Sequence, residues 1–421
     1  MIRCFTKTRI DENIAQYIHG ILSEIGGTIS ANVLIIIISL MTAVSAANIL
    51  GPHKRGELAF AIVFVALISS LADIGINQAV PYYASRNPGQ YGEILGTFIV
   101  LAFVQGVAAS LIGWLLLLLK GQHNSSAAIY LISVPFSLIT TCTASFFMGS
   151  DRLKEFNIIR TAQASSVFFG LILCLFLVNT TMLNLLAITI IIIIIFCLMA
   201  LALANRVTRI KEWKLSFTLA KKYYSYGIKS YLGNLCWLIN SKIDQLMITN
   251  FLSFSALGIY ATAVSYAGVI FSFIGAFAMV AFAKAASVPP SQGMKVVFKY
   301  LKMSMIFGIP TTVMIAIIAP IVFPIAFGKI FIKGVIPAVI LTFGGCILGI
   351  NYILSNGLRA LNYPLKPSGA EACGLIVSIF GLWLLLPIWG IIGAAVVSLS
   401  SYIVTMVVLI AFIKKIQVKN A

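Results

Sequence analysis

The sequence predicts an all-α, polytopic membrane protein with about 12 transmembrane helices in two six-helix bundles around a central cavity. Three observations lead to this prediction: the composition, the spacing of apolar stretches, and an internal repeat. Of the 421 residues, 60% are hydrophobic and only 10% are charged, and the mean hydropathy is +1.04. A soluble domain of this length cannot bury so much apolar side chain, so the chain requires a membrane.

Apolar stretches of about 20 residues, each able to cross about 30 Å of hydrocarbon as a helix, recur along the whole chain. The last two are separated only by the short connection from Pro387 to Gly390. The predicted spans are 25–50, 58–84, 93–119, 126–148, 161–178, 182–204, 230–252, 256–283, 300–327, 335–357, 370–387 and 391–413.

The basic residues lie mostly on one side of these spans. If the N-terminus is inside, most of the 29 Lys and Arg residues fall on inner segments. Because cytoplasmic loops carry the excess of positive charge, this bias predicts that both termini are cytoplasmic. It also explains the net charge of +18 without a nucleic-acid partner. The few basic residues of the outer connections are Lys54, Arg55, Lys120, Lys329 and Lys333.

A strongly basic polar connection divides the spans into two equal halves. The predicted organisation is an N-terminal six-helix bundle over 1–204, a basic cytoplasmic linker over 205–229, and a C-terminal six-helix bundle over 230–421. Since six is even, the halves have the same orientation, as in transporters built from parallel repeats. A repeat at an offset of 202 positions supports the division. Its identical pairs are Asn48/Asn250, Leu50/Leu252, Gly56/Gly258, Ala59/Ala261 and Ala61/Ala263.

Neither a metal site nor a cofactor is expected. The seven cysteines form no CxxC pair, and six of them lie within apolar stretches, where a thiol packs as a small apolar group. The three histidines lie at the ends of apolar stretches or outside them. The chain also contains no glycine-rich phosphate loop. No catalytic centre can be assembled from these residues, so the sequence does not indicate an enzyme.

The stretch Tyr231–Leu252 carries Lys242 and Asp244 near its middle. A charge at bilayer depth costs about 2.5–3.5 kcal/mol on insertion scales, so such residues face protein or water. On one continuous helix the two cannot pair, because residues two apart point in different directions. We therefore expect at least one of them to meet the cavity, with Asn240 on the Asp244 face, and the other to need a partner on a neighbouring helix. The alternative is structural pairing between helices.

Other polar residues lie near the ends of spans. Asp73 is either an interfacial hydrogen-bond acceptor or a protonatable group facing the cavity. Arg86 and Arg359 either snorkel to the inner surface or form a cationic vestibule for an anionic headgroup. Glu371 lies at a similar inner position. Arg55, beside Lys54, belongs to the only pair of adjacent basic residues on the outer side and could meet a substrate at the exit.

Four short segments carry a family resemblance. They are Leu50-Gly-Pro followed by Arg55-Gly-Glu-Leu-Ala, Ile243-Asp-Gln-Leu followed by Gly258-Ile-Tyr-Ala-Thr-Ala-Val264, Asn356-Gly-Leu-Arg-Ala-Leu, and Gly390-Ile-Ile-Gly-Ala-Ala. In order and spacing they resemble the polysaccharide transporter family. This family contains the Wzx-type O-antigen flippases, within the superfamily of multidrug, oligosaccharidyl-lipid and polysaccharide exporters.

The resemblance implies a flippase that translocates undecaprenyl-diphosphate-linked oligosaccharide repeat units across the bacterial cytoplasmic (inner) membrane. It implies alternating access, a cationic cavity, often ion coupling, and a polysaccharide polymerase and chain-length regulator as partners. It places Asp244 at the acidic position of the family's seventh span and Arg359 at the basic position of its tenth. The full assignment is Lys242, Arg359, Arg86, Asn240 and Arg55 for substrate or cavity, and Asp244 and Asp73 for ion coupling.

Three other functions remain open from the sequence. A multidrug or cation antiporter of the same superfamily would favour an acidic, aromatic cavity, whereas the bases of this chain favour an anionic substrate. A lipid II flippase of that superfamily usually has more spans. A membrane glycan polymerase would be expected to carry a large outer loop, and the outer connections here are short.

Overall fold

The computed structural model describes the backbone of residues 2–121, 125–177, 181–286, 288, 290–361, 363 and 365–420. Side chains are described within these ranges except at 2–26, 29, 177, 222–230, 232–234, 283, 286, 290, 291 and 417–420. The predicted all-α fold is confirmed, with no β-strand in the described ranges. The predicted outer connections contain two histidines, at positions 53 and 123. Position 123 lies outside the described residues.

The helices follow the apolar stretches closely, because in hydrocarbon a backbone must satisfy its hydrogen bonds within its own segment. The α-helices are α1 (Ile2–Asp73), α2 (Ile76–Arg86), α3 (Tyr91–Leu119), α4 (Ser126–Tyr130), α5 (Val134–Gly149), α6 (Leu153–Leu177), α7 (Met182–Val207), α8 (Phe217–Asn240), α9 (Ile243–Phe251), α10 (Phe254–Ala286), α11 (Pro290–Val322), α12 (Val335–Ala360) and α13 (Leu365–Asn420). Shorter elements are η1 (Pro88–Gln90), η2 (Leu131–Ser133), η3 (Ile210–Glu212), η4 (Phe323–Phe327) and η5 (Lys329–Gly334).

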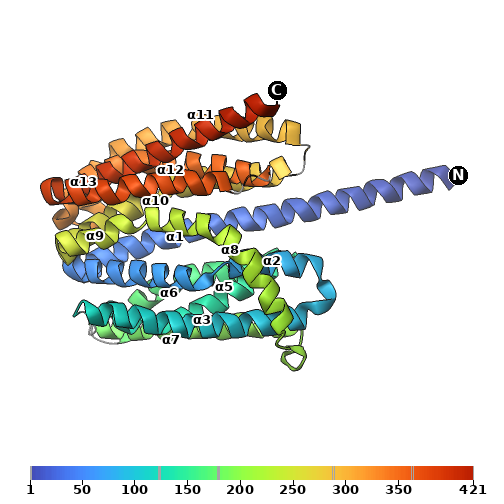
Figure 1. Cartoon of the computed structure of the whole chain (residues 1–421), viewed down its shortest axis with the longest axis horizontal. Helices are drawn as coiled ribbons and strands as arrows, with labels where there is room; N and C mark the ends of the chain where they lie inside the picture. The colour runs from blue at the N-terminus through green and yellow to red at the C-terminus, as the bar shows by residue number, and fades with distance from the viewer. Residues whose placement is uncertain are drawn as a thin grey trace.

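Two of these helices are hairpins that reverse direction at a glycine. Gly51 in α1 has φ 67° and ψ 176°, and Gly390 in α13 has φ 56° and ψ −138°. Positive φ is accessible to glycine without a steric penalty, so the chain can turn back there between two spans. In Figure 1, the light blue second part of α1 and the red second part of α13 run back beside their first parts.

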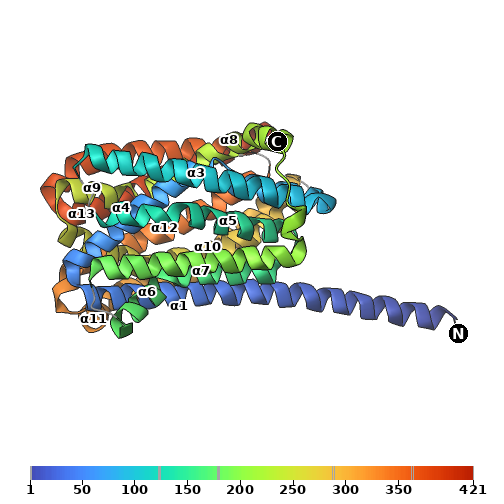
Figure 2. The same cartoon turned by 90° about the horizontal axis from the view of Figure 1, so that it is seen from below.

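Nine segments of the described chain are long and apolar enough to span a membrane. Two of them, Ser30–Asp73 and Leu365–Ile416, contain the glycine reversals. The count of about 12 spans stays a prediction. The same holds for the division into 1–204, 205–229 and 230–421. Figures 1 and 2 show that α1 begins and α13 ends at the same end of the molecule, hereafter the terminal end.

The N-terminal and C-terminal helices gather on different sides of the molecule. In Figure 1 the helices α3, α5, α6 and α7 lie on one side, and the yellow-to-red helices α10–α13 lie on the other. The two sides meet where α1 packs on α10. We call these sides the N-half and the C-half.

The backbones of the two halves touch at two glycines, at the end opposite the termini. A Cβ at Gly56 of α1 would overlap the carbonyl oxygen of Phe254. A Cβ at Gly258 of α10 would overlap the carbonyl oxygen of Pro52. Helices in lipid associate closely where small residues let their backbones approach, so this crossing depends on both glycines. They are also one of the repeat-related pairs found in the sequence.

The connection between the halves is docked on the N-half. Lys214 N–H donates to Gly92 O at 3.3 Å, and Ser216 N–H donates to Thr97 Oγ1 at 2.9 Å. A Cβ at Gly92 would lie 2.5 Å from Glu212 O, so only glycine fits beneath the connection. Helix α8 then begins at Phe217, well before the predicted span start at 230, so part of the predicted linker is helical.

The predicted continuous helix across Tyr231–Leu252 is wrong. Helix α8 ends at Asn240 and α9 begins at Ile243, with Ser241 and Lys242 between them. Lys242 has φ −133° and ψ −13°, which is not helical. The break places Asp244 in the first turn of α9, where the positive end of the helix dipole favours a carboxylate. Broken helices in membranes occur where the backbone lies in protein or beside a cavity.

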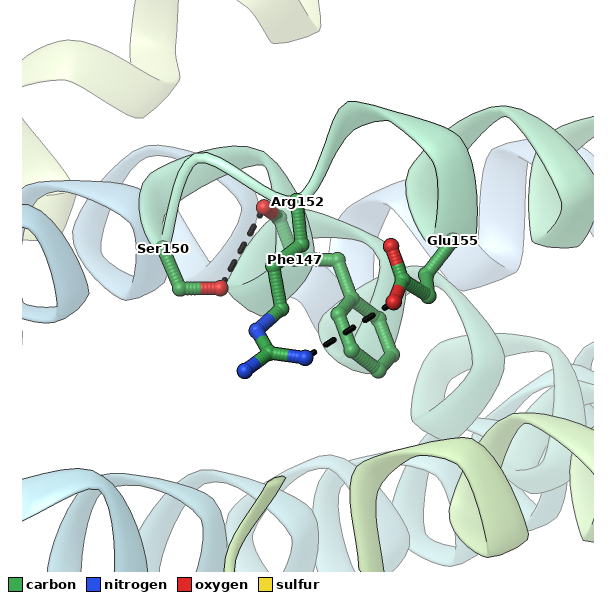
Figure 3. A network of polar contacts seen from close by, with 4 residues as sticks. All are labelled: Phe147, Ser150, Arg152 and Glu155. Atoms are coloured by element: carbon green, nitrogen blue, oxygen red, sulfur yellow. Dashed lines mark hydrogen bonds and ion pairs between the residues drawn. The ribbon is translucent and has the colours of Figure 1, made fainter. Parts of the chain in front are cut away.

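The turn between α5 and α6 shows how a basic residue of a predicted inner segment is held (Figure 3). Ser150 Oγ donates to Phe147 O at 3.3 Å, and Arg152 N–H donates to the same carbonyl at 2.9 Å. The Arg152 guanidinium lies 3.7 Å from the Glu155 carboxylate. Arg152 thus makes an ion pair and a backbone hydrogen bond at this turn.

The orientation can be tested by labelling single cysteines at opposite ends of the molecule. Lys120 and Lys214 are both exposed and lie at opposite ends of the predicted topology. We expect an impermeant maleimide added to intact cells to label Lys120→Cys and to leave Lys214→Cys unlabelled until the cells are opened. The reverse pattern, or equal labelling, would contradict the topology with both termini inside.

Candidate functional site

A cavity of about 400 Å³ lies between the two halves. The N-half contributes residues of α1, α2 and α5, and the C-half contributes residues of α8, α12 and α13. Many of the side chains that line it are polar, which is unusual for helices with such apolar sequences. Among the described residues the lining is Ser69, Ser70, Asp73, Asn77, Gln78, Leu138, Thr141, Tyr231, Leu235, Trp237, Leu238, Tyr352, Ser355, Arg359 and Glu371. We call this the central cavity.

The central cavity lies toward the terminal end. Asp73 is the last residue of α1, and Arg359 is the second-last residue of α12. Glu371 lies near the start of α13. All three are therefore on the parts of their helices that point away from the glycine crossing. The central cavity and the glycine crossing thus lie toward opposite ends of the molecule.

Asp73 is held in the cavity wall by a sharp change of chain direction. The following residues, Ile74 and Gly75, have φ values of 38° and 89°, and α2 starts at Ile76. The carboxylate Oδ1 accepts a hydrogen bond from Asn77 N–H at 3.2 Å. Asp73 is buried within the protein but borders the cavity.

Arg359 and Glu371 face the same cavity from the C-half. Arg359 Nη1 donates to Asn356 Oδ1 at 3.4 Å, and Glu371 Oε2 accepts from Asn240 Nδ2 at 3.5 Å. Their opposite charges attract each other across the wall, although no N···O distance between them is within 4.0 Å. Arg359 thus keeps donors available for a ligand in the cavity.

The central cavity is not uniformly cationic. Its described lining contains one guanidinium, that of Arg359, and two carboxylates, those of Asp73 and Glu371. The cationic cavity implied by the family resemblance therefore does not describe this region of the structure. A cavity with charges of both signs can bind an anion at Arg359 and a proton or cation at the carboxylates.

A second cavity of about 190 Å³ lies within the C-half and contains Lys242 and Asp244. We expected at least one of these two residues to meet a cavity, and the broken helix lets both line this one. Trp237 and Leu238 line both cavities, so they form the partition between them.

Asp244 is surrounded by hydrogen-bond donors. Its Oδ2 accepts from Tyr260 Oη at 2.6 Å and from Ser398 Oγ at 3.0 Å, and its Oδ1 accepts from Gln245 N–H at 2.7 Å. Bonds to a charged acceptor are stronger than neutral ones, so these groups stabilise an ionised carboxylate inside the C-half. Lys242 lies close enough for its charge to interact with that of Asp244, without a direct ion pair.

Asn240 organises the C-half and does not line either cavity. Its Oδ1 accepts from Ser378 Oγ at 2.7 Å and from Ser401 Oγ at 2.9 Å, while its Nδ2 donates to Glu371. These bonds tie the end of α8 to both parts of α13. A Cβ at Gly374 would lie 3.0 Å from Asn240 Nδ2, so glycine there makes room for the amide.

The two remaining predicted residues lie away from both cavities. Arg86, at the end of α2, is exposed and donates to Tyr82 Oη at 2.7 Å, with its guanidinium 4.3 Å from the centre of the Tyr82 ring. Arg55 is buried between α1 and α10, where its Nη2 donates to Ser265 Oγ at 3.4 Å. The structure therefore brings together Asp73 with Arg359, and Lys242 with Asp244, but not the whole predicted set.

A sequence profile of the family described as polysaccharide biosynthesis protein matches residues 46–335. The chain belongs to this family. This family agrees with the resemblance found in the sequence, which was to the polysaccharide transporter family. No curated protein matches the chain.

Solved structures place this polysaccharide biosynthesis protein in a transporter fold. It is similar to the lipid II flippase MurJ in an inward closed conformation, at 16% identity and a TM-score of 0.75, covering 92% of this chain and 87% of that one. It is similar to the inward-facing form of a multidrug resistance MATE family transporter at 12% identity and a TM-score of 0.73, covering 94% and 100%. The outward-facing form of such a transporter gives 12% identity and a TM-score of 0.62, covering 92% and 96%. These similarities show a flippase-like, MurJ/MATE-type membrane transporter fold.

Sequence reasoning missed several residues of the site. Glu371 was noted only for its inner position, although a charged residue in an apolar stretch is the same signal that identified Lys242 and Asp244. Tyr260 lies within the family-like segment that starts at Gly258, but nothing in the sequence links it to Asp244. Trp237 carries no charge that would single it out in the sequence, and its role as a partition depends on contacts between distant helices.

The charge-assisted bond from Tyr260 to Asp244 should be a major stabiliser of the C-half. We expect Tyr260→Phe to lower the free energy of unfolding by about 1.5–3 kcal/mol, since it removes a donor from a buried carboxylate. Tyr266→Phe on the same helix is the matched control, because Tyr266 Oη donates to the neutral Ile315 O at 2.6 Å. This loss should cost only about 0.6–1 kcal/mol. Thermal unfolding in detergent measures both; equal costs would contradict an ionised Asp244.

Proposed function

We propose that this protein is a flippase for undecaprenyl-diphosphate-linked oligosaccharide repeat units of O-antigen or a related surface polysaccharide. It moves them across the bacterial cytoplasmic membrane by alternating access, coupled to an ion. The observation that carries the proposal is a polar cavity between the two halves, which lies toward the end opposite their glycine crossing. The family match to polysaccharide biosynthesis proteins supports the class of cargo.

The physics of the cargo fits this cavity. A diphosphate with attached sugars is polar and anionic, so it cannot cross hydrocarbon without shelter. A cavity of about 400 Å³ falls within the usual range for ligand sites, and its position toward the terminal end suits entry of a headgroup from that side. The polyprenyl tail can stay in lipid while the headgroup occupies the protein.

Arg359 is the proposed phosphate-binding group of the central cavity. A guanidinium offers a planar fork of donors that matches phosphate oxygens, and Arg359 is the one base in the described lining. Asp73 and Asp244 are the proposed ion-coupling residues, with Asp73 in the central cavity and Asp244 in the second cavity. Lys242 is proposed to assist substrate binding from the second cavity, behind the partition of Trp237 and Leu238.

We propose that both termini are cytoplasmic and that this conformation faces inward. The basic residues of the terminal end support this orientation. The higher TM-score with the inward-facing than with the outward-facing MATE structure supports the conformation. On release at the outer surface, the glycan would be available to a polysaccharide polymerase and a chain-length regulator.

A second candidate function is export of organic cations in exchange for an ion. It is favoured by Asp73 and Glu371, because two carboxylates against one guanidinium give the described lining an acidic balance. Lipid II is a third possible cargo, since the MurJ structure has a similar fold. The same reconstituted protein can be offered all three cargoes.

In proteoliposomes we expect fluorescent undecaprenyl-diphosphate oligosaccharide to change leaflet, measured by quenching with an impermeant reductant. Fluorescent lipid II should move more slowly, and ethidium should not be transported under the same ion gradient. Movement of ethidium alone would overturn the flippase proposal in favour of the antiporter. Lipid II moving faster than the oligosaccharide lipid would reassign the cargo.

The phosphate role of Arg359 predicts a dependence on charge. We expect Arg359→Gln to lower the flipping rate about tenfold, because a charge-assisted bond to phosphate is lost. Arg359→Lys keeps the charge without the fork and should retain a rate within about threefold of the wild type. Arg206→Gln, at an exposed position in the last turn of α7, controls for loss of any arginine. Unchanged flipping by Arg359→Gln at normal protein level would rule out this role.

A further inference from the structure

Arg55 is a buried cation, and the described part of the chain gives its guanidinium few hydrogen bonds and no ion pair. The residue is only 7% exposed. Its bond to Ser265 Oγ, at 3.4 Å, is longer than an ordinary N–H···O bond, and its Nε has no hydrogen-bond partner. No described carboxylate forms an ion pair with it. A buried charge without a counter-charge is costly, so this residue does not serve stability in this conformation.

The glycine crossing lies directly outside this guanidinium. Arg55 immediately precedes Gly56, which packs on α10 at Phe254 and Gly258. Its partner Ser265 is two turns farther along α10 than Gly258, or about 10 Å deeper into the protein. The Arg55 side chain therefore runs from the crossing inward, between α1 and α10, with its head on the side of the cavities.

The crossing joins the halves, which distinguishes it from other close glycine contacts. Gly106 packs on Pro135, and Gly170 packs on Thr189, but each of these contacts lies within the N-half. Those contacts can persist while the halves move as rigid bodies. The contacts of Gly56 and Gly258 must break if the halves separate at this end.

We propose that the Gly56/Gly258 crossing is the outer gate of the transport pathway and that Arg55 is an anion site exposed when this gate opens. The site takes a diphosphate group, such as that of the lipid-linked cargo; its identity as cargo rests on the proposed function. With α1 and α10 apart, phosphate oxygens or water reach the guanidinium and supply the partners that it lacks in the closed form. Phosphate binding at Arg55 then favours the open state, because only that state makes the contact.

The gate is tested by the accessibility of a cysteine placed behind it. Ser265→Cys, in a chain whose seven native cysteines are replaced, reports exposure to an impermeant maleimide added from outside. We expect Gly258→Ala to raise its labelling rate at least about tenfold, because the methyl group overlaps Pro52 O in the closed form. Gly275→Ala on the same helix is the matched control, since a Cβ there meets only the Tyr352 ring at 3.9 Å. Equal rates in both variants would overturn the gate.

A second measurement does not depend on the alanine variant folding well. His53 and Phe254 face each other across the crossing with ring centroids 5.9 Å apart. Cysteines at these two positions, joined by a short bifunctional thiol reagent, should hold the gate shut. A Ser265→Cys reporter carried in the same chain lies behind the closed gate while the pair is linked, and its residual labelling from outside should then disappear. Labelling that continues at the unlinked rate would equally overturn the gate.

The anion site is tested with inorganic pyrophosphate as the probe. In the Gly258→Ala background, outside pyrophosphate should protect Ser265→Cys from labelling. Arg55→Gln should raise the concentration for half-protection about tenfold, whereas Arg55→Lys should raise it less. Protection that is absent, or that is identical in Arg55→Gln, would overturn the anion site. None of these three assays involves glycan transport. Failure of the flippase proposal would therefore show separately, as pyrophosphate protection without movement of any diphosphate lipid.

Discussion

The approach of α1 and α10 at Gly56 and Gly258 is the contact on which the arrangement of the halves depends. In lipid there is no hydrophobic gain from pressing two apolar helices together, so close packing of small residues supplies the attraction. Here each glycine lies against a backbone carbonyl of the opposite helix, which no larger residue could do. The central cavity lies between the same halves, toward the other end of the molecule.

The polar residues of the membrane region fall into two groups with different surroundings. Asp244 and Asn240 receive hydrogen bonds from hydroxyl groups of α10 and α13, so their desolvation is compensated inside the C-half. Asp73 and Arg359 instead border a cavity shared by both halves. The first group fixes the shape of one half, and the second can respond to what enters between them.

Much of the fold could be predicted because hydropathy and backbone hydrogen bonding leave few choices for a chain in lipid. The site could be predicted only in part. The stretch Tyr231–Leu252 was singled out by Lys242 and Asp244, but a helical wheel assumes a continuous helix, and the break at Lys242 invalidates it. The meeting of Asp73 with Arg359 and Glu371 depends on how two halves pack, which no local pattern of residues encodes.

The docked connection between the halves has a consequence for how the chain tolerates changes in length. A free tether controls the separation of two bodies through its contour length. Here the stretch around Lys214 and Ser216 is hydrogen-bonded to α3 and lies over Gly92, so the position where α8 starts is set by register on that helix. Residues added between Val207 and this stretch would bulge into solvent without moving α8, whereas residues added between Ser216 and the body of α8 would displace the C-half.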